Sequence, residues 1–144
     1  MGKQYFGTSI NNSSTICAAS AADVDDIRCK VVAFDDTGKI VVASTAGETV
    51  VGLVIPTAGD AEGKIVTGDM VDVQIKDIGV AIAGGAIDAG AAVCADASGN
   101  IIAATEDGQF ILGYALNAAA KDDYVEIQIA KGFFAKAATD KEVI

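Results

Sequence analysis

Histidine and tryptophan are absent from this 144-residue sequence, and proline and arginine each occur once. Without histidine, every catalytic triad or zinc motif that needs an imidazole is excluded. The serines and lysines lie in no recognisable nucleophile setting, and no GxGxxG or P-loop pattern follows the glycine-rich runs. The sequence therefore predicts no catalytic residues, no metal site and no cofactor, and we do not expect an enzyme.

Positive charge is also scarce, because ten Lys and Arg stand against twenty Asp and Glu, which leaves a net charge of -10. Such a chain repels phosphate backbones and anionic lipid headgroups, so we expect neither a nucleic acid nor a membrane as partner. The amino-terminal residues lack the apolar core of a secretory signal. Cys17, Cys29 and Cys94 have no CxxC spacing, which favours reduced thiols. We therefore expect the protein to stay in the cytoplasm in which it is made.

The apolar residues that are present are mostly small or β-branched, with 27 Ala, 15 Val and 16 Ile against 3 Leu. This composition favours strands. Residues 31–34 and 39–43 are two such runs, and they flank the turn sequence Asp35-Asp36-Thr37-Gly38. The pattern predicts a β-hairpin, in which the aspartates, like Asp96 further along, hydrogen-bond their own backbone.

An internal repeat follows from aligning the sequence with itself. At an offset of 61, eight of the residues between 25 and 58 meet identical partners: Val32, Asp35, Gly38, Ile40, Ala43, Gly47, Gly52 and Ala58. At an offset of 54, residues 71–75 match residues 125–129, and both runs alternate apolar and polar side chains as a strand with one buried face does. The change of offset predicts an insertion near residues 59–63 of the first copy.

These features predict an all-β fold, with a β-barrel or sandwich-like body built from two quasi-repeated β units and an extended N-terminal arm. The expected organisation is an arm at 1–24, a β domain at 25–130 with units at about 25–79 and 86–132, and a C-terminal tail at 131–144, in which residues 133–144 are expected to be coil. Gly52 and Gly113 interrupt matching strands, which predicts a bulge or a close backbone approach. The small apolar run at 78–85 is interpreted as a strand packed closely on another backbone.

Several of these runs occur in a recognisable order, namely 38–43, 51–54, 71–75, 89–93, 96–101, 112–115 and 125–129. Together they resemble the small decoration or cement proteins that tailed bacteriophages place on the outside of their heads. The resemblance extends from about Arg28 to Ile129. It implies a structural virion protein that assembles as a homotrimer, binds the major capsid protein and ties neighbouring subunits of the viral capsid together. It also implies synthesis in the host bacterial cytoplasm and a final place on the outer capsid surface.

The expected arm at 1–24 has no amphipathic period, yet it carries the apolar residues Tyr5, Phe6, Ile10 and Ile16. A polar segment without a core pattern needs a partner in order to become ordered. We therefore expect these four residues to contact the capsid.

Two other functions remain open from the sequence. A head-fibre or receptor-binding module would use the same β body, with an additional domain or an aromatic-rich tip, whereas aromatic residues make up only 6% of this chain. A biotinyl- or lipoyl-type carrier domain also has two quasi-repeats and a strand start such as Gly68-Asp69-Met70-Val71. A carrier needs a modifiable lysine at a hairpin tip, where this chain has only Lys39, and an intact mass would reveal the covalent cofactor.

Overall fold

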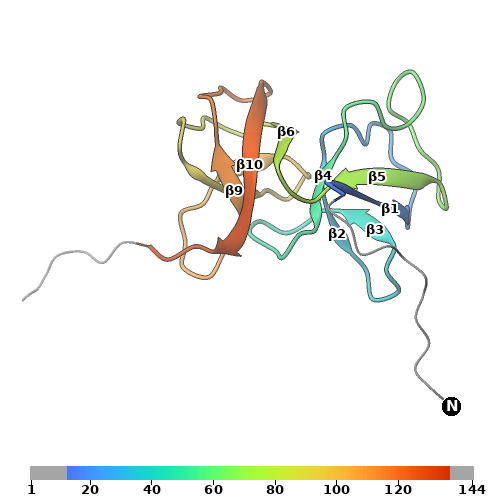
Figure 1. Ribbon diagram of the computed structural model, residues 1–144, viewed down its shortest axis with the longest axis horizontal. Helices are drawn as coiled ribbons and strands as arrows, with labels where there is room; N and C mark the ends of the chain where they lie inside the picture. Colours follow the sequence, from blue (N-terminus) through green and yellow to red (C-terminus); the bar gives the residue numbers. More distant parts are fainter. Residues whose placement is uncertain (1–12, 137–144) are drawn as a thin grey trace, which may run out of the picture.

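The computed structural model describes residues 13–136 of the chain. These residues contain ten β-strands, joined by turns and loops, and no α-helix (Figure 1). The first five strands are β1 (Thr15–Ala19), β2 (Val31–Phe34), β3 (Ile40–Val42), β4 (Gly52–Val54) and β5 (Met70–Gln74). The second five are β6 (Ile78–Ile82), β7 (Ala92–Ala95), β8 (Ile101–Ala103), β9 (Phe110–Ala115) and β10 (Tyr124–Phe133). Within these residues there is no helix long and apolar enough to cross a membrane.

The strands form two five-stranded antiparallel sheets that lie side by side in one sandwich-like body (Figure 1). The strand order is β1-β5-β4-β2-β3 in the first sheet and β6-β10-β9-β7-β8 in the second. Each strand of the first sheet thus has a counterpart five strands later. We call residues 15–74 unit 1 and residues 78–133 unit 2. The all-β, two-unit prediction is confirmed.

The first strand corrects the predicted extent of the arm. β1 pairs with β5 over its whole length, from Thr15 opposite Gln74 to Ala19 opposite Met70. Ser20, the next residue, is buried and forms a bridge with Ile40. Residues 15–20 are therefore part of the body, because without them the edge of β5 would lack its hydrogen-bonding partner.

Unit 2 and the C-terminal tail also have different limits from those predicted. Unit 2 begins with β6, the counterpart of β1, and not at residue 86. Its last strand continues to Phe133, so residues 131–133 of the predicted tail belong to β10. A register shift between Ile129 and Gly132 bends this long strand while keeping it paired with β9.

The turns form as the sequence predicts. Asp35 Oδ1 accepts the backbone N–H groups of Thr37 at 2.9 Å and Lys39 at 3.0 Å, which closes the β2–β3 hairpin. In unit 2, Asp96 Oδ1 accepts the N–H groups of Ser98 at 2.8 Å and Asn100 at 2.9 Å. The predicted insertion is also present, because the connection at 55–69 between β4 and β5 is longer than the one at 116–123 between β9 and β10.

Two equivalent glycines allow close contacts between strands. A Cβ atom on Gly52 would lie 2.0 Å from the carbonyl oxygen of Gln74, and a Cβ on Gly113 would lie 2.0 Å from that of Gln128. Real Cβ atoms do not approach a backbone oxygen so closely, so both positions require glycine. The predicted close backbone approach is confirmed at both sites.

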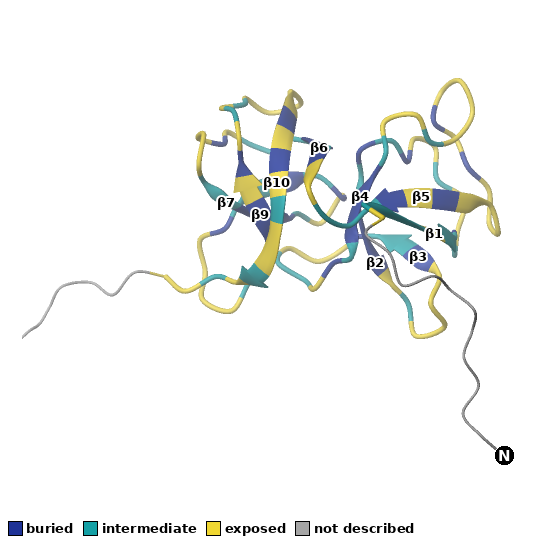
Figure 2. Cartoon of the chain, viewed as in Figure 1, coloured by how far each residue is buried: buried dark blue, intermediate teal, exposed yellow. Residues whose placement is uncertain are grey.

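The two units share one core. Its members are mostly from the interior of unit 2, such as Val93, Ile101 and Ile127, but Val31 and Leu53 of unit 1 belong to the same cluster. A second cluster fills the interior of unit 1 around Val32, Val71 and Val73 and contains no residue of unit 2. Figure 2 shows the alternation of buried and exposed residues along β5 and β10, which separates these interiors from the outer faces.

Candidate interaction surfaces

Several acidic side chains accept hydrogen bonds from the backbone of turns. No group of three or more potential ligands among residues 13–136 is placed to hold a metal ion. Asp60, for example, accepts the N–H groups of Lys64 and Glu62, each at 2.9 Å. These hydrogen bonds hold the pKa of Asp60 below its usual value. Asp72 and Glu126 lie at equivalent exposed positions of β5 and β10. A turn carboxylate with a lowered pKa is ionised near neutral pH, which suits it to hydrogen bonding in the turn and not to proton transfer.

All three cysteines are free thiols. Burial raises the pKa of Cys29 and of Cys94. Cys17 is exposed on β1, and there desolvation and the neighbouring Asp72 carboxylate raise the pKa of the thiol. Because the thiolate is the reactive form, each of these shifts lowers the nucleophilicity of the cysteine near neutral pH.

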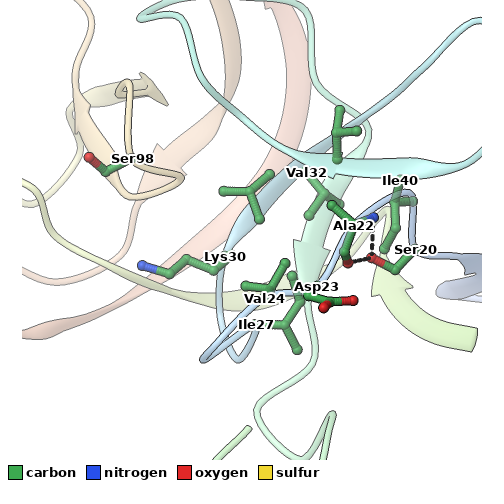
Figure 3. Close-up of a pocket in the computed structure, with 11 residues that line it drawn as sticks. Ser20, Ala22, Asp23, Val24, Ile27, Lys30, Val32, Ile40 and Ser98 are labelled. Atoms are coloured by element: carbon green, nitrogen blue, oxygen red, sulfur yellow. Dashed lines mark hydrogen bonds between the residues drawn. The ribbon is translucent and has the colours of Figure 1, made fainter. Parts of the chain in front are cut away.

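A cavity of about 400 Å³ opens between the β2–β3 hairpin, the segment at 20–30 and the tip of the β7–β8 hairpin (Figure 3). Its walls are mainly apolar, with side chains such as Val24, Ile27 and Ile40. The two charged groups in the wall are already bound, since Lys30 Nζ donates to Asn100 Oδ1 at 3.1 Å and Asp23 Oδ1 accepts the N–H of Thr67 at 2.8 Å. The cavity thus offers shape and apolar surface but no reactive group.

The outer face of unit 2 is the surface that stands out by composition. We use this name for the exposed face of β6, β10 and β9, which carries Ile78, Tyr124, Tyr114 and Leu116 as exposed large side chains. Gln128 is directly opposite both Ile78 and Tyr114, so these side chains form one row across three strands.

The edge strand on the corresponding face of unit 1 carries smaller side chains. On the edge strand, the outward positions of β6 carry Ile78, Val80 and Ile82, whereas those of β1 carry Thr15, Cys17 and Ala19. Neither fold nor turn chemistry requires large apolar side chains at exposed positions. Exposed apolar groups that gather on one face are typical of an interaction surface.

Only one of the four predicted capsid-contact residues lies within the residues that the structure describes. Tyr5, Phe6 and Ile10 lie outside the described residues. Ile16 is in β1, where it is half-buried and packs against the interior of unit 1. Its side chain thus contributes to the body. The outer face of unit 2 was missed from the sequence because its residues come from three strands, although the large side chains at alternate positions of β6 were a signal.

Comparisons with known proteins identify the family. The family model described as phage cement protein matches residues 59–130, which is half of the chain. A search of curated proteins finds no match.

Among solved structures, the chain is similar to the N base of the head fiber protein gp8.5 of bacteriophage phi29, with 20% sequence identity and a TM-score of 0.54. The match covers 81% of this chain and 92% of that one, which shows a shared fold. The chain belongs to the phage cement protein family and is a structural protein of the phage virion.

Proposed function

We propose that this protein is a capsid decoration, or cement, protein that binds the outer surface of a phage head and stabilises the lattice of the major capsid protein. The family match over residues 59–130 carries this proposal. The body supports it, because two sheets that share one core form a stiff element, and the outer face of unit 2 offers apolar surface to a partner.

The charge of the chain favours the outside of the head. With a net charge of -10, the protein is repelled by packaged DNA, whose phosphates dominate the electrostatics of the interior. The outer capsid surface is free of this repulsion.

The N-terminal arm is proposed to contribute to capsid binding, now limited to the residues before β1 and thus to Tyr5, Phe6 and Ile10. Its attachment point is fixed, because the Ser14 hydroxyl is hydrogen-bonded to the Asp77 carboxylate between the units. In a homotrimer, three arms would act together, since one bound arm raises the effective concentration of the other two.

The test uses heads that lack this protein. Purified full-length chain is mixed with such heads, the heads are pelleted, and the bound fraction is measured as a function of protein concentration. We expect saturable binding and an increase in the temperature at which the heads rupture. An absence of binding would contradict the proposed function.

The contribution of the arm is tested by deleting residues 2–12, which leaves every described strand in place. We expect this truncated chain to bind the same heads about tenfold more weakly or worse, because the multivalent arms are gone. Unchanged affinity would assign the capsid contact to the β body alone.

A second candidate function is the base of a head fibre, and the shared fold with the phi29 fiber base favours it. Images of decorated heads distinguish the two functions. A cement protein adds low features to the capsid surface, whereas a fibre base carries a projection that extends away from it.

A further inference from the structure

The contact between the two units of one chain shows how one unit binds another. Unit 1 contributes the outward side chains of β2, β3 and β4 with their flanking residues, which we call the accepting face: Val31, Ala33, Val41, Ala43, Val50 and Leu53. Unit 2 places the tip of its β7–β8 hairpin on this face. The N–H of Val31 donates to the carbonyl of Gly99 at 2.8 Å, and the N–H of Gly47 donates to that of Ala95 at 2.9 Å.

Unit 2 carries an accepting face of its own. The residues 61 positions further along are Ala92, Cys94, Ile102, Ala104, Ile111 and Tyr114. Five of them form a separate apolar cluster, which the side chain of Phe134 partly covers. The N–H of Gly108 donates to the carbonyl of Phe134 at 2.9 Å, which repeats the bond between Gly47 and Ala95.

This cover is incomplete. Leu53 in unit 1 is 0% exposed, whereas its counterpart Tyr114 is 43% exposed. In unit 1 the Leu53 side chain lies against Gly79 of β6, which belongs to the other unit. The described part of the chain places no third unit against Tyr114. The accepting face of unit 2 therefore continues into the exposed outer face described above.

The hairpin that would fill such a face is exposed as well. The counterpart of the β7–β8 tip is the β2–β3 tip of unit 1, at residues 35–39. Gly99 is buried at the contact between the units, whereas Gly38 is exposed. Ala95 is 0% exposed, whereas Phe34 is 46% exposed. The β2–β3 tip is thus exposed, whereas on the accepting face of unit 2 Tyr114 is exposed and Cys94, Ala104 and Ile111 are buried near Phe134.

We propose that the β2–β3 hairpin of a second copy of this chain displaces Phe134 and binds the accepting face of unit 2, so that copies join head to tail through a repeat of the internal contact. This inference rests on the proposed function and on the homotrimer that the family resemblance implies, and it names the two surfaces in contact. The contact is heterologous, because the two copies contribute different surfaces, and a closed ring of copies satisfies every such surface. Tyr114 and Phe34 supply apolar area on opposite sides of the contact.

A cross-linking experiment tests the register of this contact. Within one chain, Lys30 and Asn100 are hydrogen-bonded across the contact at 3.1 Å. The equivalent residues between copies are Ala91 and Lys39. We would introduce Ala91→Cys and Lys39→Cys together, in a chain whose exposed Cys17 is changed to Ser, and treat it with a short bismaleimide cross-linker. Cys29 and Cys94 are buried and stay in place.

The matched control combines Ala91→Cys with Glu62→Cys in the same background. Glu62 is exposed in the insertion of unit 1, which has no counterpart in unit 2. We expect multimers linked between copies for the Ala91–Lys39 pair and at least tenfold less product for the control. Equal yields for the two pairs, or no product for either, would overturn the proposal.

A second variant measures association without cysteines. Phe34→Glu places a charge in the proposed contact, and Met70→Glu places one at an exposed position of unit 1 outside it. We expect light scattering to show a loss of oligomer for Phe34→Glu only, with both variants folded by circular dichroism. An oligomer that survives Phe34→Glu would overturn these surfaces, whereas the proposed decoration function fails only if the chain does not bind heads.

Discussion

At the scale of single residues, glycine sets the distance between neighbouring strands. The positions of Gly52 and Gly113 leave no room for a side chain, since a Cβ there would meet a backbone oxygen that cannot move without breaking the sheet. The same requirement at equivalent sites of both units is the physical basis of the repeated glycine. Most of the other identities that reveal the repeat lie at turns or on buried strand positions, where the choice of residue is also narrow.

We expect Gly113→Ala to lower the free energy of unfolding by about 3 kcal/mol, because the new methyl group is forced onto the carbonyl of Gln128. Gly85→Ala is the matched control, since nothing lies within 4 Å of a Cβ at that position. Urea denaturation followed by circular dichroism measures both. Equal unfolding midpoints for the two variants would contradict the close approach.

Asp35 makes stability depend on pH. The Thr37 hydroxyl, at 2.7 Å, and the backbone N–H of Lys39 lower the pKa of the Asp35 carboxyl. A group whose pKa is lower in the folded state stabilises the fold above its unfolded pKa, near 3.9, and loses this effect as the pH falls through the folded value.

We therefore expect Asp35→Ala to lower the urea midpoint at pH 7 and to have a smaller effect near pH 2. Asp36→Ala, in the same turn, is the control for the loss of one negative charge. If the effect of Asp35→Ala were the same at both pH values, the carboxylate would not be the stabilising group.

At the scale of the elements, β1 decides where the arm ends and the body begins. It covers the edge of β5, and its residues Ile16 and Ala18 pack against the interior of unit 1. A deletion of residues 2–20 removes this strand, whereas a deletion of residues 2–12 does not.

We expect the longer deletion to cost about 3 kcal/mol, from the lost burial of Ile16 and Ala18 and the uncovered edge of β5. For a domain of this size that corresponds to a fall in Tm of roughly 10 °C. The shorter deletion should leave Tm unchanged. Thermal unfolding of the two truncated chains decides the matter, and equal Tm values would contradict the role of β1.

The hairpins and the repeat were predictable because they depend on short-range features. Asp35 and Gly38 mark a turn by their own chemistry, and the runs at 71–75 and 125–129 alternate strictly. β1 was not predictable in the same way. It is the counterpart of β6 at an offset of 63, different from the offset of the later strands, and its Thr-Ile-Cys-Ala-Ala sequence is short of large apolar residues.

One identity in the alignment was misleading. Ala58 matches Ala119 at the offset of 61, but in the structure Ala119 bridges Ile87 as Ile65 bridges Val24. The counterpart of Ala119 is therefore Ile65, on the far side of the insertion. The outer face of unit 2 could not be predicted for a related reason, since only the pairing of β6, β10 and β9 brings Ile78, Tyr114 and Tyr124 onto one surface.

At the scale of the whole molecule, the two units form a stiff acidic body, and Tyr114 of unit 2 is exposed where its counterpart Leu53 of unit 1 is buried. A comparison of the two units therefore distinguishes residues that folding requires from residues that are available for binding. Folding requires the glycines, turns and alternating strands that both units share. Binding is expected at the positions where the units differ.

We propose that this protein occupies the outer surface of a phage head. Cryo-electron microscopy of heads with and without the protein tests it most directly, with the chain labelled at its C-terminus to mark its location. We expect additional density of the size of the β body at regular positions on the outside of the shell, present only in heads that carry the protein. Label inside the shell, or identical outer surfaces in the two kinds of head, would contradict it.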